Sequence, residues 1–122
     1  LALSGDTLVV GSYERNGMTT MPGRADVFVR VGNDFVHQAT LSAANASLAF
    51  AVSLAIDGDD LLVGDQIAER VTVYRRTAGT WAQTQQLQPP DAVQGTSFSV
   101  SLAIEGDLVA VGRPYFPSFS QR

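Results

Sequence analysis

Short apolar runs separated by turn-forming residues recur along the whole chain. In the middle of the sequence they span Phe50–Ile56, Leu61–Gly64, Arg70–Arg76 and Trp81–Leu87, with Gly, Asn or Asp in the gaps between several of them. Such runs, rich in β-branched and aromatic side chains, are typical of strands. No segment has the apolar positions three and four residues apart that an amphipathic helix needs. The pattern therefore predicts an all-β protein built from antiparallel hairpins.

Two-residue turns are predicted where a glycine follows a short polar or acidic residue between two of these runs. The pairs are Ser4-Gly5, Asp57-Gly58 and Glu105-Gly106. Turns of this kind favour positive φ at their central positions, and glycine adopts positive φ without strain. Asn33 and Gly79 mark the hairpin between the third and fourth strands of two successive groups of four.

The same order of segments occurs more than once. Stretches beginning at Leu1, Leu54 and Leu102 read LALSGDTLVVGS, LAIDGDDLLVGD and LAIEGDLVAVGR, and they begin 53 and 48 residues apart. Two further similar stretches end at Phe35 and Trp81, 46 residues apart. Because several landmarks keep the same register, the sequence predicts tandem structural repeats.

Four antiparallel strands in each repeat are typical of a β-propeller blade. A β-sandwich has similar strand spacing, but it does not explain why whole four-strand units repeat. Since a closed propeller has about four to eight blades, we expect a partial propeller of about two and a half blades. Unit one spans 1–49 and lacks the start of its first strand, unit two spans 50–97, and a truncated unit three spans 98–122. We expect structural roles for the residues that recur in register: Phe35, Phe50, Gly58, Gly64, Trp81, Phe98, Gly106 and Gly112.

The residues that open units two and three resemble the FG-GAP repeat family, seen in integrin α-subunit heads and in many bacterial surface and secreted proteins. The family pattern has an aromatic-Gly pair before a first strand and then a Leu-Val-Gly-Ala-Pro-like stretch. The matching positions are Phe50-Ala51 and Phe98-Ser99, then Leu61 to Asp65 and Val109 to Pro114, with Leu8 to Ser12 in unit one. Alanine and serine stand where the family has the first glycine. The resemblance implies a β-propeller fold and an exported protein, outside the cell or on its surface, of bacterial type.

Integrin-type repeats carry a calcium loop between their first two strands, and calcium needs six to eight oxygen ligands. Between Ile56 and Leu61 this sequence has only Asp57, Gly58 and two further aspartates, and the other units are equally short. A turn of this length points its carboxylates apart, and such side chains cap backbone N–H groups. The resemblance is therefore to a calcium-free branch, and we expect no metal and no other cofactor.

Composition excludes several classes of function. The chain has 12 acidic residues and 8 basic ones, with a net charge of −4, which argues against a nucleic-acid surface. The absence of cysteine excludes disulfides, cysteine-based zinc sites and a cysteine nucleophile. No apolar run approaches the ~18 residues that a membrane-spanning helix needs, so we expect no membrane span in this segment.

Candidate catalytic residues are few. His37 is the single histidine, and its register partner in unit two is Gln83, so the repeat does not require it. None of the serines lies in the Gly-x-Ser-x-Gly motif of a serine hydrolase. We therefore expect no enzyme. The alternative is the scaffold of a propeller enzyme, of lyase or glycosidase type, with its catalytic residues in other blades.

The first unit contains a seven-residue insertion within the segment Tyr13 to Gly23, because its landmarks are 53 and 46 residues from those of unit two. This loop mixes aromatic, charged and sulfur side chains in the way of contact surfaces, namely Tyr13, Glu14, Arg15, Met18 and Met21. Loops on rigid scaffolds commonly carry recognition. The sequence therefore predicts a recognition or adhesion module that binds a protein or glycan and adjoins the remaining blades of the same polypeptide. A purely architectural spacer is the other alternative.

Overall fold

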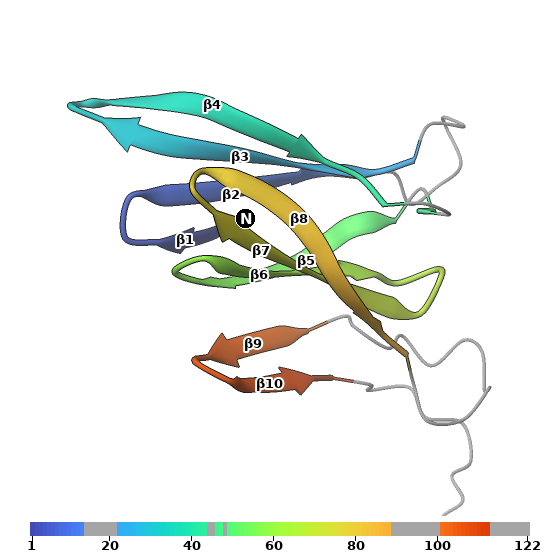
Figure 1. Cartoon of the computed structure of the whole chain (residues 1–122). Helices are drawn as coiled ribbons and strands as arrows, with labels where there is room; N and C mark the ends of the chain where they lie inside the picture. The colour runs from blue at the N-terminus through green and yellow to red at the C-terminus, as the bar shows by residue number, and fades with distance from the viewer. Residues whose placement is uncertain (14–21, 44–45, 48, 89–100, 113–122) are drawn as a thin grey trace, which may run out of the picture.

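The computed structural model describes residues 1–13, 22–43, 46–47, 49–88 and 101–112, and these form β-strands without a helix (Figure 1). The all-β prediction is confirmed. None of the described residues forms a helix that is long and apolar enough to cross a membrane. The four strands predicted in the second unit agree with the observed strands to within one residue at each end.

The described strands form two four-stranded antiparallel sheets and one hairpin, each in simple chain order. The first sheet contains β1 (Ala2–Ser4), β2 (Thr7–Ser12), β3 (Arg24–Val31) and β4 (Asp34–Leu41). The second contains β5 (Phe50–Asp57), β6 (Asp60–Asp65), β7 (Arg70–Thr77) and β8 (Thr80–Leu87). The hairpin consists of β9 (Leu102–Glu105) and β10 (Leu108–Val111). The second sheet packs against the first on one face and against the hairpin on the other (Figure 1).

The predicted two-residue turns are present, but their central residues are shifted by one position. Ser4 pairs with Thr7, and Asp57 pairs with Asp60, so the central pairs are Gly-Asp. Only the glycines have positive φ, at 56° to 62°, which is the type II′ arrangement with glycine first. The prediction that the residue before each glycine lies inside the turn was therefore wrong. That residue ends its strand, and the side chains of Ser4 and Asp57 reach the next sheet or hairpin.

The main core lies between the first two sheets. Val9, Ala25 and Val27 alternate along β2 and β3 and are fully buried, because side chains two residues apart share one face of a strand. From the second sheet Phe50, Ala51, Leu61, Val63 and Tyr74 meet them. A smaller core around Leu62 and Val71 faces β9 and β10. The continuous apolar run of β6 follows from this burial on both faces.

The start of β5 packs against β2 and β3 at the level of the main chain. A Cβ atom on Gly11 would overlap the carbonyl oxygen of Ala51, and one on Gly23 would overlap that of Phe50. Ala51 has a φ of 74° and is 1% exposed, in a bulge where the pairing of β5 with β6 shifts. Two glycines and one left-handed residue therefore set how closely the sheets approach.

We predict that Gly11→Ala destabilises the fold by about 2–3 kcal/mol, because the added methyl group meets a backbone oxygen that cannot rotate away. Urea unfolding followed by the fluorescence of Trp81, the one tryptophan of the chain, measures the change.

Ala51→Gly is the matched control for this contact. It relieves about 1 kcal/mol of left-handed strain and removes a buried methyl group of similar value, so its unfolding midpoint stays close to that of the native chain. A Gly11→Ala variant with a native midpoint would contradict the close approach.

Candidate functional site

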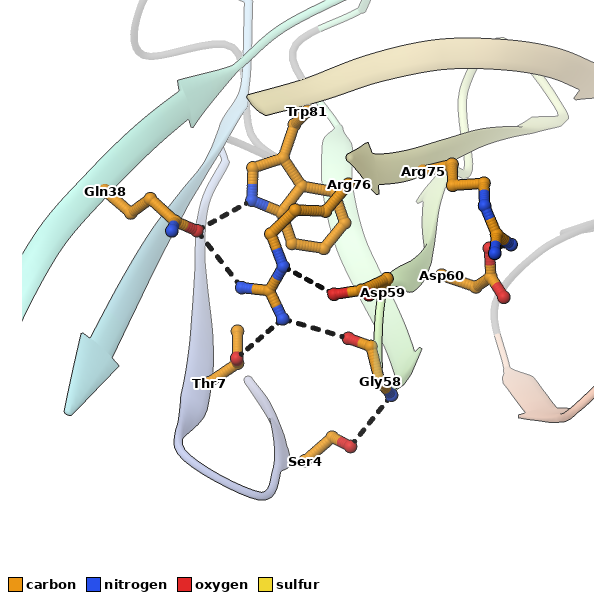
Figure 2. Close-up of polar contacts among 9 residues, drawn as sticks. All are labelled: Ser4, Thr7, Gln38, Gly58, Asp59, Asp60, Arg75, Arg76 and Trp81. Atoms are coloured by element: carbon orange, nitrogen blue, oxygen red, sulfur yellow. Dashed lines mark hydrogen bonds and ion pairs between the residues drawn. The ribbon is translucent and has the colours of Figure 1, made fainter. Parts of the chain in front are cut away.

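The guanidinium group of Arg76 in β7 connects the two sheets (Figure 2). Within its own sheet Nε donates to Asp59 Oδ1 at 2.7 Å and Nη2 to the carbonyl oxygen of Gly58 at 3.3 Å. Toward the first sheet Nη2 also donates to Thr7 Oγ1 at 3.1 Å and Nη1 to Gln38 Oε1 at 3.2 Å. The side chain is 15% exposed. A planar five-donor group is suited to such a contact, since it serves acceptors on both sides at once.

Trp81 completes this contact. The Arg76 guanidinium lies 4.7 Å from the centre of the indole ring, within the range of a cation–π interaction. Indole Nε1 donates to Gln38 Oε1 at 2.9 Å (Figure 2). The ring also packs against the main core. Both the polar and the apolar part of Trp81 are therefore engaged between the sheets. Phe35, its register partner in the first sheet, is 47% exposed.

The three aspartates around the β5–β6 turn have separate partners. Asp57 Oδ2 accepts from the backbone N of Gly106 at 2.7 Å, and Asp59 is held by Arg76. Asp60 pairs with the exposed Arg75 at 2.7 Å. In the described part of the chain, no three His, Asp or Glu side chains gather in a way that could hold a metal ion.

His37 in β4 belongs to a hydrogen-bonded cluster on the outer face of the first sheet. Its Nε2 lies 3.0 Å from Thr40 Oγ1 and 3.2 Å from Asp26 Oδ1, and Thr40 Oγ1 donates to the same carboxylate oxygen at 2.6 Å. An Asp–His–hydroxyl relay uses both ring nitrogens, one for each partner. Here one nitrogen makes both contacts, so these residues lack the geometry of that relay.

The pKa of Asp26 is set by opposing effects. Partial burial raises it, but hydrogen bonds from Thr40 and His37 and the charge of Arg24, 3.5 Å away, outweigh the burial. The net pKa lies below the usual 3.8. The cluster therefore stabilises the ionised form of the carboxylate.

Most of the predicted recognition loop lies outside the described residues. Tyr13 is described and is 45% exposed, whereas Glu14, Arg15, Met18 and Met21 are not described. The end of the loop is fixed at Gly23, whose backbone N donates to the carbonyl oxygen of Ser47 at 3.0 Å in the β4–β5 connection.

The carboxylate of Asp65 holds together the edge of the sheets that carries the β2–β3, β4–β5 and β6–β7 connections. It is 1% exposed and accepts from the backbone N of Ser47 at 2.8 Å, from the Ser47 hydroxyl, and from the backbone N of Ala68 at 3.0 Å. Together with the bond from Gly23 to Ser47, it joins the β2–β3, β4–β5 and β6–β7 connections. The sequence interpretation missed this role; a carboxylate directly after the continuous apolar run Leu61–Gly64 was the available signal.

The other residues predicted to have structural roles lie mostly in the core or in tight turns. Phe50 is in the core, Gly64 is buried in β6, and the backbone N of Gly112 donates to the carbonyl oxygen of Ser101 at 2.8 Å. Gly58 and Gly106 occupy tight turns. Phe98 lies outside the described residues.

We predict that Arg76→Ala destabilises the fold by about 2 kcal/mol, since it removes the donor to the buried Thr7 hydroxyl and the guanidinium group that packs on Trp81. The adjacent Arg75→Ala is the matched control, because an exposed ion pair contributes at most about 0.5 kcal/mol. Urea unfolding compares the two variants, and equal losses would refute the role of Arg76.

We predict that the Asp26 carboxyl titrates below its usual 3.8 in the native protein. A lowered pKa in the folded state stabilises the fold fully above the unfolded-state pKa, and this stabilisation is lost as pH falls through the folded-state pKa. Carboxyl-carbon NMR from pH 2 to 7 measures the titration. Thr40→Val should move the midpoint upward, and an unchanged midpoint would contradict the cluster.

The sequence was also compared with known proteins. No protein-family model matches it, and no curated protein matches it. The likeness to FG-GAP repeats therefore stays a prediction from the residues of this chain.

Proposed function

We propose that the chain is a non-catalytic recognition or adhesion module, part of an exported, FG-GAP-like β-propeller. It binds a protein or glycan through the loop from Tyr13 to Gly23. The carrying observation is the anchoring of this edge: Gly23, Ser47 and Asp65 hold three connections together through main-chain and carboxylate hydrogen bonds. A loop that starts from such a fixed base can present side chains to a partner at limited entropic cost.

Two exposed apolar side chains at this edge are available to a ligand. Tyr13 is 45% exposed and Ile67, in the β6–β7 connection, is 57% exposed. In the described residues the prominent polar groups of the opposite edge are engaged in contacts between turns and sheets. The edge that carries the longer connections is therefore the better candidate for a ligand.

Two features support the repeat family. Ala51 has a φ of 74° at the position where the family has glycine, so the backbone there is the one that glycine favours. Gly11, in the apolar-Gly stretch, faces the Ala51 carbonyl too closely for any side chain. Glycine at both family positions, those of Ala51 and Gly11, would thus allow the same close contact between the two main chains. The non-catalytic part of the proposal is supported by the geometry at His37, where one nitrogen makes both polar contacts.

A loop exchange tests the proposal. Residues 13–22 are replaced by Gly and Ser at equal length, with Gly23 retained for its contact with Ser47. Binding is measured on a printed glycan array and on a panel of purified extracellular-matrix proteins. We expect the native chain to bind at least one probe and the exchanged chain to lose at least tenfold in affinity while unfolding at the same urea concentration.

The matched control changes the opposite edge. Ala78-Gly79 is replaced by Asn-Gly, which keeps positive φ at both central positions of the β7–β8 turn, and binding should be unchanged. Unchanged binding after loop exchange would contradict the proposal. A native chain that binds none of the probes would favour the architectural spacer.

A further inference from the structure

Within the described residues, the first sheet has one face that no other sheet covers, and this face has the same pattern of side chains as the face of the second sheet that packs against the first. We define the front face as the side of β1–β4 turned away from β5–β8. Its apolar residues Leu1, Leu3 and Phe35 are 86%, 62% and 47% exposed. Their register partners Leu54, Ile56 and Trp81 pack against the core between the sheets. The front face therefore resembles the face of β5–β8 that packs against β1–β4.

The polar groups of the front face repeat as well. Arg30 donates to Asp6 through Nε at 3.0 Å and Nη2 at 2.6 Å, and its backbone N donates to the Asp6 carbonyl at 2.8 Å. The Arg76–Asp59 pair has the same main-chain bond. Yet the Arg30 side chain is 54% exposed, whereas that of Arg76 is 15% exposed beneath the neighbouring sheet.

A third repeated contact runs along the tight turns. The backbone N of Gly58 donates to Ser4 Oγ at 3.0 Å, and the backbone N of Gly106 donates to Asp57 Oδ2 at 2.7 Å. In each case the residue before one turn glycine accepts from the next turn glycine. In the first sheet the backbone N–H of Gly5 is the corresponding donor. By its match to Gly58, this N–H lies on the front face, together with Arg30 and Phe35.

We propose that the front face docks a further four-stranded sheet of this same repeat. The partner sheet carries the chemistry that β1–β4 presents to β5–β8: an alkyl stripe like that of Val9, Val27 and Leu41, and a hydroxyl and an amide oxygen placed for Arg30. It also carries a side-chain oxygen for the N–H of Gly5. This inference rests on the repeat architecture of the proposed function and is independent of its ligand.

A second copy of the chain fits this face less well. The alkyl face of β1–β4 is already covered by the second sheet, and the corresponding face of β5–β8 is covered by β9 and β10. The described residues of the third repeat form only a two-stranded hairpin. In the described part of the chain, no complete four-stranded sheet therefore has its alkyl face free for another molecule.

The test extends the full chain by one unit. A copy of residues 1–53 is fused before Leu1, so that it joins Leu1 as the native connection joins Leu54. Since the chain has no cysteine, Phe35→Cys in the original unit gives a single thiol. We expect maleimide labelling of this thiol to be at least tenfold slower in the extended chain than in the unextended chain. Thr80→Cys, at the exposed β7–β8 turn, is the control and should label equally in both.

Equal labelling of the thiol at position 35 in both chains would overturn the inference. Labelling that slows with concentration in the unextended chain would also overturn it, because a second copy would then cover the face. A second measurement is independent of the cysteine. Arg30→Ala should lower the urea midpoint of the extended chain and leave that of the unextended chain nearly unchanged. Loop binding is unaffected in either case, so this failure is distinct from a failure of the proposed function.

Discussion

The close approach of the β5 main chain to Gly11 and Gly23 is the constraint on which the other contacts depend. It sets the separation of the two sheets at a distance that no side chain at either glycine would permit. At this separation the alkyl groups of Val9 and Val27 reach Leu61 and Val63 and form the main core. The same separation brings Thr7 and Gln38 within hydrogen-bond distance of Arg76. Polar and apolar contacts are therefore two results of one backbone geometry.

Burial distinguishes the polar contacts that stabilise the packing of the sheets from exposed ion pairs that contribute little to stability. Arg75 and Arg76 are neighbours, and each pairs with an aspartate at 2.7 Å. Arg75 remains in solvent, where the pair gains little over two hydrated charges. Arg76 is covered by Trp81 and the first sheet, where an unmatched acceptor is costly. A count of ion pairs would treat the two residues as equal.

The strands were predictable from sequence because they depend on local pattern, whereas the contacts between sheets were not. The apolar run of β6 reflects burial on both faces of the strand, which leaves a local pattern in the sequence. The turn glycines were recognised, but the central pair was placed one residue early, since register depends on the partner strand. The contacts of Asp65 with Ser47 and of Gln38 with Arg76 join residues 18 and 38 positions apart, which only the packing of the sheets brings together. Of the predicted recognition loop, Tyr13 and the anchor at Gly23 belong to the described residues, and its remaining predicted side chains do not.

The hydrogen bonds from Gly58 and Gly106 to the residue that precedes the turn glycine of the neighbouring unit have an evolutionary consequence. The donor is a main-chain N–H, which every unit possesses whatever its side chains are. The acceptor is serine in one unit and aspartate in the next. Neighbouring units thus need little co-adaptation at this point. A gene encoding such units can gain, lose or exchange one by recombination, because at this contact a new unit needs no specifically matched side chain to donate the hydrogen bond.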